Sequence, residues 1–467
     1  SYTRADSLVE RIRDTYRGLG SKNQLSKIAK PIFQRTIDCA LRLWQRGAGE
    51  PYLQRAWQAA EKSKSVELLE SLRETEARQL AGFRPEDQQH EKLQKRNLDF
   101  YEKLVFDEQA KPYPDSSRIA NWNRKIFDLK ASQDSLLAVF QKRYPEYHRL
   151  KYDRRLATIA DVQTKLPAGN ALVEYFLGDS VLFTFLIEHG QARVFKQNID
   201  TSFHQNFAAL RAMVHDFDPA MPRTTPQKRV DFQKFTAASH ALYQTLLAEP
   251  LAHTRARNLV VVPDDQIGYV PFAALLRQPV AASVAPDYRH LPYLVNDIAV
   301  RLEYSGTLLT RQPTRDGSAG GYLGMAPVYQ GGSGNSGLAA RALPDSLRFA
   351  RAFSLLRGGE VPALHFNRVE IDSTQHFLKG ESAAGEAATE AFFKKNAPNA
   401  GVLHLAMHAL TNDVDPLYST LLFSNPNPAD STGENDGFLH AYELYKLRLR
   451  ADLAVLSACN TGAGKVV

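Results

Sequence analysis

The sequence predicts an α+α/β protein, in which an N-terminal helical region is followed by α/β units with mostly parallel sheets. Residues 1–150 contain few glycines and many Leu, Ala, Glu, Lys, Arg and Gln residues, as helices do. Near residue 166 the period changes, and short runs rich in Val, Leu and Phe begin to alternate with helical segments. Two late apolar runs, 402–408 and 453–459, have the length and composition of buried strands.

The N-terminal region is predicted to hold pairs of helices. Apolar residues such as Ile37, Leu41 and Trp57 recur at near-helical spacing, and the segment 47–51 (Gly-Ala-Gly-Glu-Pro) separates two helices. Helix–turn–helix pairs of this kind stack in tetratricopeptide arrays with a repeat of about 34 residues, of which one or two would fit. A plain helical bundle is the alternative. The polar segment 91–108 is interpreted as a helical hairpin arm.

The remaining elements follow in order along the chain. Two apolar runs flanking Gly178-Asp179 predict a β-hairpin. Further strands are expected at 259–263, 298–304 and 322–326, helices at 203–215 and 231–247, a short strand-to-helix unit at 267–276, and flexible loops at 330–338 and 425–437. These parts are enough for two α/β units, one after the other.

Bulk properties exclude several classes of protein. The excess of 58 basic over 51 acidic residues is spread over 467 positions without a dense basic block, so no nucleic-acid partner is expected. No run approaches the about 18 to 20 apolar residues of a membrane helix, and no signal peptide opens the chain. The two cysteines, Cys39 and Cys459, form no disulfide framework. We therefore expect a cytoplasmic protein that does not contact membranes.

The two late apolar runs each end on a residue that can do chemistry. The first stops at His408 and the second at Cys459, which is followed by Asn-Thr-Gly. If both strands lie in one parallel sheet, their carboxyl ends share the edge where such sheets place their sites. A thiol needs a nearby base to become a thiolate, so the pattern predicts a Cys–His hydrolase. The alternatives are an inert buried thiol and a core histidine. His404, four residues earlier in the same run, is interpreted as structural.

A phosphate-binding loop is a competing interpretation of the same segment. The sequence 459–466 faintly resembles G-x-x-x-x-G-K-[ST], but Cys459 replaces the first glycine and Val466 replaces the hydroxyl residue. The glycine permits the tight turn and the hydroxyl holds magnesium, so both differences argue against nucleotide binding. His404, His408, His440 and Cys459 also lack metal-site spacings. No cofactor and no metal are expected.

Several motifs together resemble the CHAT domain, whose members are caspase-like cysteine peptidases related to separase and usually preceded by tetratricopeptide repeats. The motifs are His404–Ala409, Leu417–Ser419, Gly437–Leu444 and Asp452–Gly462, with further matches at Ala60–Lys64, Tyr144–Tyr147, Glu174–Phe176, Val262–Asp264 and Ala326–Tyr329. The resemblance implies a catalytic dyad of His408 and Cys459, with an oxyanion hole formed by the backbone N–H groups of Ala409 and Cys459. Many members have Gly where this chain has Ala409, and Thr where it has Met407.

The resemblance also implies a domain organisation. Residues 1–150 would be the tetratricopeptide-like region with its helical arm, 151–315 an inactive caspase-like half, and 316–467 the active half. A caspase-like sheet continues beyond its catalytic strand, whereas the sequence ends eight residues after Cys459. We therefore expect the active half to be truncated.

The function predicted from the sequence is that of a cysteine endopeptidase acting on protein substrates. Asp413 and Asp415 follow the histidine strand and would attract a basic substrate side chain, although a solvated loop is the alternative. The N-terminal helices would bind a protein regulator, a substrate or a second copy. Family members often act in bacterial defence, so a partner-gated protease is expected by analogy. The alternative function is that of an inactive scaffold that uses the helical region for protein binding.

Overall fold

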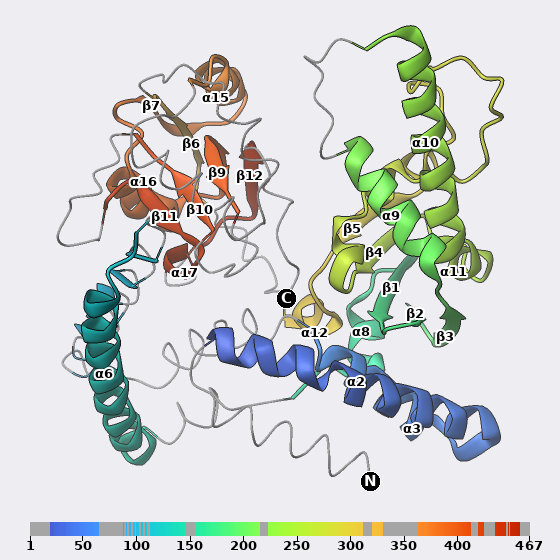
Figure 1. The fold of residues 1–467 in the computed structure, drawn as a ribbon, viewed down its shortest axis with the longest axis horizontal. Coiled ribbons are helices and arrows are strands. Elements are labelled where there is room, and N and C mark those ends of the chain that lie inside the picture. The colour runs from blue at the N-terminus through green and yellow to red at the C-terminus, as the bar shows by residue number, and fades with distance from the viewer. Residues whose placement is uncertain are drawn as a thin grey trace. The chain divides into compact units, whose positions relative to one another are not determined.

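The structure is a computed structural model, and it divides into two compact units that are described separately (Figure 1). The first unit contains the described residues of Ser1–Leu69 and Arg154–Pro313, and the second contains those of Glu70–Asp153 and Thr314–Lys465. The described residues are 19–64, 113–144, 155–214, 223–311, 320–329, 363–411, 419–424, 435–444, 447 and 449–457, with isolated positions between 87 and 109.

The first unit is built on a five-stranded mixed sheet with the strand order β3-β2-β1-β4-β5. Its strands are β1 (Asn170–Leu177), β2 (Val181–Glu188), β3 (Gln191–Asn198), β4 (Asn258–Val262) and β5 (Ala299–Leu302). Strands β1, β2 and β3 form an antiparallel meander, while β1, β4 and β5 run parallel. The hairpin predicted around Gly178-Asp179 is confirmed, because β1 and β2 pair on either side of it.

Helices cover both faces of this sheet (Figure 1). The helices are α2 (Leu19–Leu43), α3 (Glu50–Glu61), α8 (Ile159–Lys165), α9 (Thr201–Val214), α10 (Thr225–Tyr243), α11 (Glu249–Ala252) and α12 (Gly306–Arg311). Side chains of α9 and α10 form one core with alternate residues of β1. Side chains of α2, α3 and α8 form the other core with the residues between them, such as Leu172 and Phe176. Alternation along a strand therefore sends β1 side chains into two different cores.

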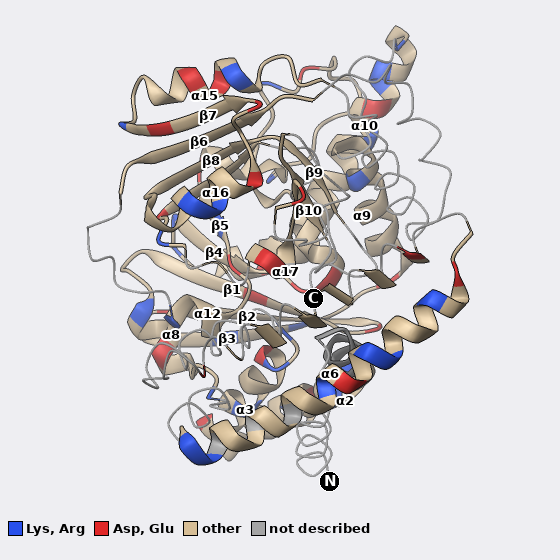
Figure 2. Cartoon of the chain, turned by 90° about the vertical axis from the view of Figure 1, so that its left-hand side faces the viewer, with Lys and Arg blue, Asp and Glu red and all other residues tan. Residues whose placement is uncertain are grey.

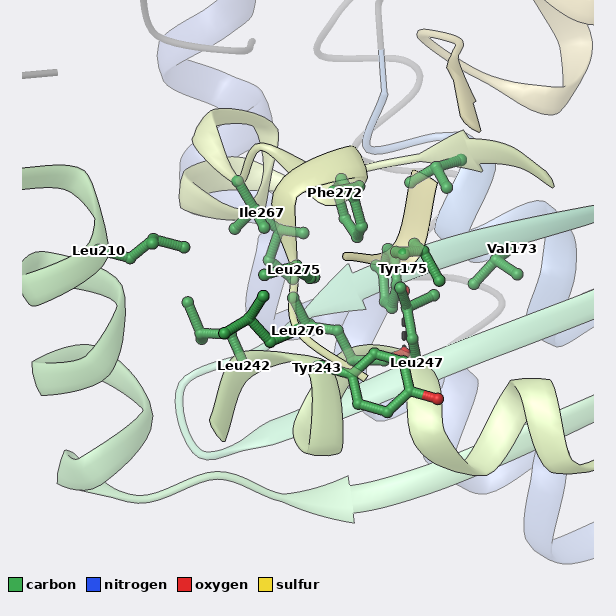
Figure 3. Close-up of a cluster of buried hydrophobic side chains, with 14 of the residues drawn as sticks. Val173, Tyr175, Leu210, Leu242, Tyr243, Leu247, Ile267, Phe272, Leu275 and Leu276 are labelled. Atoms are coloured by element: carbon green, nitrogen blue, oxygen red, sulfur yellow. Dashed lines mark hydrogen bonds between the residues drawn. The ribbon is translucent and has the colours of Figure 1, made fainter. Parts of the chain in front are cut away.

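The core on the α9 and α10 face is closed by aromatic side chains (Figure 3). Tyr175 is fully buried, stacks on Phe272 with ring centroids 6.0 Å apart, and donates a hydrogen bond of 2.9 Å to the carbonyl of Leu246. Because a buried hydroxyl needs a partner, this bond lets tyrosine fill a core position.

The turn between α2 and α3 lies where the sequence predicts it. Gly47 and Gly49 have φ angles of 82° and 97°, which residues with a Cβ atom rarely adopt. A π-helical turn, Trp44–Ala48, ends the first helix, and Pro51 lies in the first turn of the second. Both helices pack on the sheet of the first unit, and Trp57 of α3 is completely buried in this core. A tetratricopeptide-like arrangement of the N-terminal helices stays a prediction.

The second unit contains a four-stranded parallel sheet and a three-stranded antiparallel sheet. The parallel sheet has the order β12-β8-β6-β7 and the antiparallel sheet the order β11-β10-β9. The strands are β6 (Tyr322–Pro327), β7 (Gly380–Gly385), β8 (Val402–Ala406), β9 (His408–Leu410), β10 (Thr420–Leu422), β11 (Phe438–His440) and β12 (Leu453–Ser457), and the helices are α6 (Ser116–Arg143), α15 (Asn367–Gln375), α16 (Glu390–Asn396) and α17 (Ala441–Leu444).

Charged residues are absent from several parallel strands of the two units. Strands β4, β6, β8 and β12 carry no Lys, Arg, Asp or Glu, and the coloured residues of Figure 2 lie mainly on helices and connections. Strands β4, β6 and β8 are mainly buried, as continuous apolar runs in parallel sheets usually are, whereas β12 is mainly exposed. No helix in the described part of the chain has the length and apolar character needed to cross a membrane.

The predicted fold class is confirmed: helices come first, and mixed α/β units with partly parallel sheets follow. The strand expected near Ile267 is wrong, since Asp265–Tyr269 and Phe272–Ala274 are short 3-10 helices. Ile267 and Phe272 are buried although they lie in these short helices. The apolar composition therefore predicted burial but not the secondary structure. The predicted loop 330–338, most of 425–437 and half of the arm 91–108 lie outside the described residues, and the described positions of the arm are helical.

Candidate active site

The carboxyl ends of two neighbouring parallel strands form the candidate site. Strands β8 and β12 pair in parallel from Val402 and Leu453 to Ala406 and Ser457. The last residues of the two strands are therefore level with each other. The condition that both late apolar runs place a strand in one parallel sheet is met by residues 402–406 and 453–457.

The candidate chemical residues lie at equal distances along the chain from this last pair. His408 follows Ala406 by two positions, and Cys459 follows Ser457 by two positions. His408 is described and half-buried, whereas Cys459 lies outside the described residues. Asp413 and Asp415, the predicted substrate pocket, lie outside them as well.

The histidine strand differs from the prediction, which made 402–408 one strand ending at His408. Strand β8 ends at Ala406, and His408 is instead the first residue of β9 in the antiparallel sheet. The chain changes sheets at Met407, whose side chain is buried in the core of the second unit. The apolar pattern continues through this change because both sheets contribute to one core, so sequence alone could not reveal the break.

The predicted oxyanion residue Ala409 lies within β9. It pairs with Leu421 of β10, next to the pair formed by His408 and Leu422. Its side chain is half-buried against the apolar core. The backbone that follows His408 is thus held by a sheet ladder.

Tyr329 is in direct contact with His408. Its ring centroid lies 4.7 Å from that of the imidazole, at an interplanar angle of 53°. The N–H of His408 donates a hydrogen bond of 3.2 Å to the tyrosine Oη, which in turn donates one of 2.7 Å to the carbonyl of Leu422. Burial of Tyr329 raises the pKa of its hydroxyl well above the usual value, so the group stays protonated. The sequence interpretation missed this role.

His404 has a different environment, in agreement with the structural role expected for it. It is buried, and both ring nitrogens have partners: Nδ1 lies 3.0 Å from the hydroxyl of Tyr322, and Nε2 lies 2.9 Å from Oε1 of Glu370. A ring held at both nitrogens has no nitrogen left to accept a proton from a thiol.

Helix α15 also fixes the strand ends at the site. The side-chain amide of Asn367 donates hydrogen bonds of 2.8 Å to the carbonyl of Pro327 and 3.3 Å to the carbonyl of Ala406. These carbonyls end β6 and β8, where the sheet ladder stops. One side chain therefore ties the two strands together at the candidate edge.

A buried acidic cluster in the same unit was also missed by sequence reasoning. Burial raises the pKa of Glu390 to about 7, although Lys394 lies 2.6 Å away and lowers it. Its other carboxylate oxygen accepts a 2.8 Å hydrogen bond from the N–H of Gly437. Lys394 also pairs with Glu443 at 3.0 Å. The cluster joins α16, α17 and the residue before β11.

No group of three or more His, Cys, Asp or Glu side chains within the described ranges is arranged to hold a metal ion. The described part of the candidate site consists of His408, Tyr329 and the ends of β8 and β12.

The fold and the strand ends define an α/β protein whose candidate site lies at the carboxyl edge of a parallel sheet. Residues 236–467 match the family model of the CHAT domain, so this part of the chain is a CHAT domain. This family is related to caspase-like cysteine peptidases. No curated protein matches the chain.

Proposed function

We propose that the protein is a caspase-like cysteine endopeptidase in which His408 and Cys459 form the catalytic dyad. The observation that carries the proposal is the register of β8 with β12, which makes Ala406 and Ser457 a level pair. Each candidate residue lies two positions beyond that pair in the sequence. Membership of residues 236–467 in a family related to such peptidases supports the same chemistry.

The proposed reaction is acyl transfer from a peptide bond to water. His408 accepts the thiol proton of Cys459, and the thiolate attacks the substrate carbonyl carbon. The peptide nitrogen takes the proton from the imidazolium and leaves as an amine, which creates a thioester. Water, deprotonated by the imidazole, then releases the acid and restores the thiol. Backbone N–H groups of Ala409 and Cys459 would stabilise the oxyanion.

The environment of His408 supports a role as the base. The imidazole is half-buried, so water and a substrate can reach it, whereas His404 is enclosed and paired at both nitrogens. An imidazole titrates near neutral pH, where a thiol has to be activated. Two histidines from one apolar run thus have separate roles.

Asp413 and Asp415 would favour a basic residue at the cleaved bond, and the N-terminal helices would carry a regulatory partner. Both are proposals from the sequence and the family resemblance. An inactive scaffold is the alternative outcome of the experiments below.

The direct test incubates the full chain with a proteome-derived peptide library and identifies new peptide ends by mass spectrometry. Cleavage after a defined residue is expected for the wild type and for Cys39→Ala, and is expected to disappear in Cys459→Ala. Cys39 is the matched control, because it is an exposed thiol on α2 in the other unit.

A second test measures thiol activation without a substrate. The rate of iodoacetamide alkylation is followed at both cysteines of the same molecule, so Cys39 provides an internal reference. An activated Cys459 reacts rapidly near neutral pH, and His408→Ala is expected to slow it about tenfold. If neither cleavage nor this dependence on His408 is observed, the scaffold alternative is favoured.

A further inference from the structure

Strand β6 and the two residues after it bring one tyrosine to each of the two histidines. Tyr322, at the start of the strand, places its hydroxyl 3.0 Å from Nδ1 of His404. Tyr329, just beyond its end, lies against the ring of His408. The two contacts differ in kind, because Tyr322 bonds to a ring nitrogen whereas Tyr329 bonds to the backbone.

The Tyr329 hydroxyl lies between the two members of a strand pair. His408 of β9 and Leu422 of β10 are register partners. The His408 N–H donates to Oη at 3.2 Å, and the Oη–H donates to the Leu422 carbonyl at 2.7 Å. The hydroxyl thus bridges a donor and an acceptor at the point where the chain has just changed sheets.

The ring of Tyr329 is held as firmly as its hydroxyl. The residue is 6% exposed and packs with Leu422 and Phe438 in a small apolar cluster. Its ring has little freedom to rotate, so it forms a fixed wall against the imidazole of His408. The backbone and the ring of the candidate base are therefore both contacted by this one tyrosine.

We infer that Tyr329 is a positioning residue for His408, which holds the backbone through its hydroxyl and the imidazole through its ring. The inference rests on the proposed function, because positioning matters for catalysis only if His408 is the base. Tyr329 transfers no proton in this scheme, since its hydroxyl is occupied at both the donor and the acceptor side.

Tyr329→Phe tests the inference, with Tyr322→Phe as the matched control. Both changes remove one tyrosine hydroxyl near β6, but only the first removes the bridge between His408 and Leu422. Without the hydroxyl, the buried carbonyl of Leu422 loses one hydrogen-bond donor, and we expect the two strands to close and move His408. Because small displacements of a catalytic group are costly, Cys459 alkylation should slow about tenfold in Tyr329→Phe. Tyr322→Phe should leave it within about twofold of the wild type.

Histidine NMR of the full chain supplies a readout that a purely structural tyrosine would not affect. The chain has 13 histidines, and the His408 ring signal is assigned by its loss in His408→Ala. Tyr329→Phe should shift this signal, whereas Tyr322→Phe should shift that of His404 instead. Equal alkylation rates in the two tyrosine variants, together with an unmoved His408 signal, would overturn the inference.

Two further outcomes separate the inference from the proposed function. If His408→Ala leaves the Cys459 rate unchanged, the proposed function fails. The position of the His408 signal in Tyr329→Phe then still decides whether the tyrosine holds the histidine. Hydrogen exchange of the wild type needs no variant: the His408 amide should be protected, and exchange as fast as in an unstructured peptide would contradict the bridge.

Discussion

The carboxyl ends of the parallel strands are used in opposite ways in the two units. In the first unit, the edge formed by β1 and β4 is filled by buried charged side chains, foremost Lys64, which is 6% exposed. In the second unit, the edge formed by β8 and β12 leads to the half-buried His408. The same sheet geometry thus gives an anchor for helices in one unit and the candidate site in the other.

The anchor in the first unit is Lys64, which follows helix α3. Its Nζ donates hydrogen bonds to the carbonyls of Tyr175 in β1 and Pro263 after β4, and it lies 3.8 Å from Asp264. Asp264 in turn accepts a 2.7 Å hydrogen bond from the N–H of Leu177, the last residue of β1. A buried charge is tolerated only with such partners. The edge is therefore occupied by groups that satisfy one another.

A second carboxylate extends the anchor to helix α12. Glu61 accepts hydrogen bonds of 2.8 Å from the N–H of Gly306 and 2.7 Å from that of Thr307. The pKa of Glu174 in β1 is raised well above its usual value. Burial is the largest cause, and the nearby negative charge of Glu61 is the second. The buried carboxylates and Lys64 at this edge thus pair with one another and with backbone groups, whereas the edge at His408 leads to a half-buried imidazole.

Removal of Lys64 is expected to have the largest effect on stability. Lys64→Met removes a hydrogen-bond donor from the buried carbonyls of Tyr175 and Pro263. It also removes the buried positive charge beside Asp264. We expect the free energy of unfolding of the first unit to fall by about 3 to 5 kcal/mol, as when a buried ion pair loses one member. Chemical denaturation measures it.

Lys30→Met is the control for this variant. Lys30 lies 3.4 Å from the same Asp264, but its side chain is 24% exposed. Its loss should cost about 1 kcal/mol, because solvent screens exposed pairs. Equal losses in the two variants would contradict the view that Lys64 seals the edge.

The second prediction concerns the pH dependence of the anchor. Burial raises the pKa of Glu174 well above its usual 4.5, so the folded protein keeps a proton that the unfolded chain releases. The free energy of unfolding should therefore fall as the pH rises above about 4.5, by up to about 1.4 kcal/mol per pH unit, until the folded-state pKa is reached. Glu174→Gln should remove this contribution. If the free energy of unfolding of the variant and the wild type changed in parallel with pH, the prediction would be wrong.

The third prediction applies the same comparison to the second unit. The pKa of Glu390 is raised to about 7, so its contribution to stability should be lost between about pH 4.5 and 7 and then level off. Glu390→Gln should flatten the profile only in this window, which closes at about pH 7. Denaturation at half-unit pH steps distinguishes the two windows.

Much of this comparison could be anticipated from the sequence, but the contacts could not. The apolar runs at 402–408 and 453–459 predicted two buried strands, because length and composition identify such strands, and these would share an edge if they lay in one parallel sheet. The motifs that contain Glu61, Lys64, Glu174 and Asp264 were all recognisable in the sequence. That they meet in one cluster depends on contacts between positions as far apart as 64 and 263, which no local pattern encodes.

The break at Met407 and the role of Tyr329 were missed for a related reason. Strand β9 leaves the parallel sheet because it pairs with β10, and a pairing partner cannot be identified from the apolar character of a run. In the sequence, nothing relates Tyr329, two residues after β6, to His408, which lies 79 positions later. The contact between them is formed only in the folded chain. Residue types therefore indicated the candidate chemistry, while the surroundings that tune it required the structure.

The smallest expected effects come from two helix caps, one in each unit. Thr158 accepts a hydrogen bond from the Asp161 N–H, and Asp161 accepts one in return, which makes a capping box on α8. Thr389 caps α16 with a single bond, from the N–H of Phe392. Thr158→Ala should cost about 1 kcal/mol and Thr389→Ala about 0.5 kcal/mol.

These caps also test whether the two units are energetically separate. Hydrogen exchange followed by mass spectrometry reports on peptides from β1 and β8 in the same sample. Thr158→Ala should accelerate exchange in β1 while leaving β8 unchanged, and Thr389→Ala should do the reverse, since neither residue contributes to the core of the other unit. Acceleration of both strands by either variant would mean that the units unfold together. In that case the sealed edge of the first unit would also stabilise the strands that carry the candidate site, and Lys64→Met would then weaken His408 function from a distance.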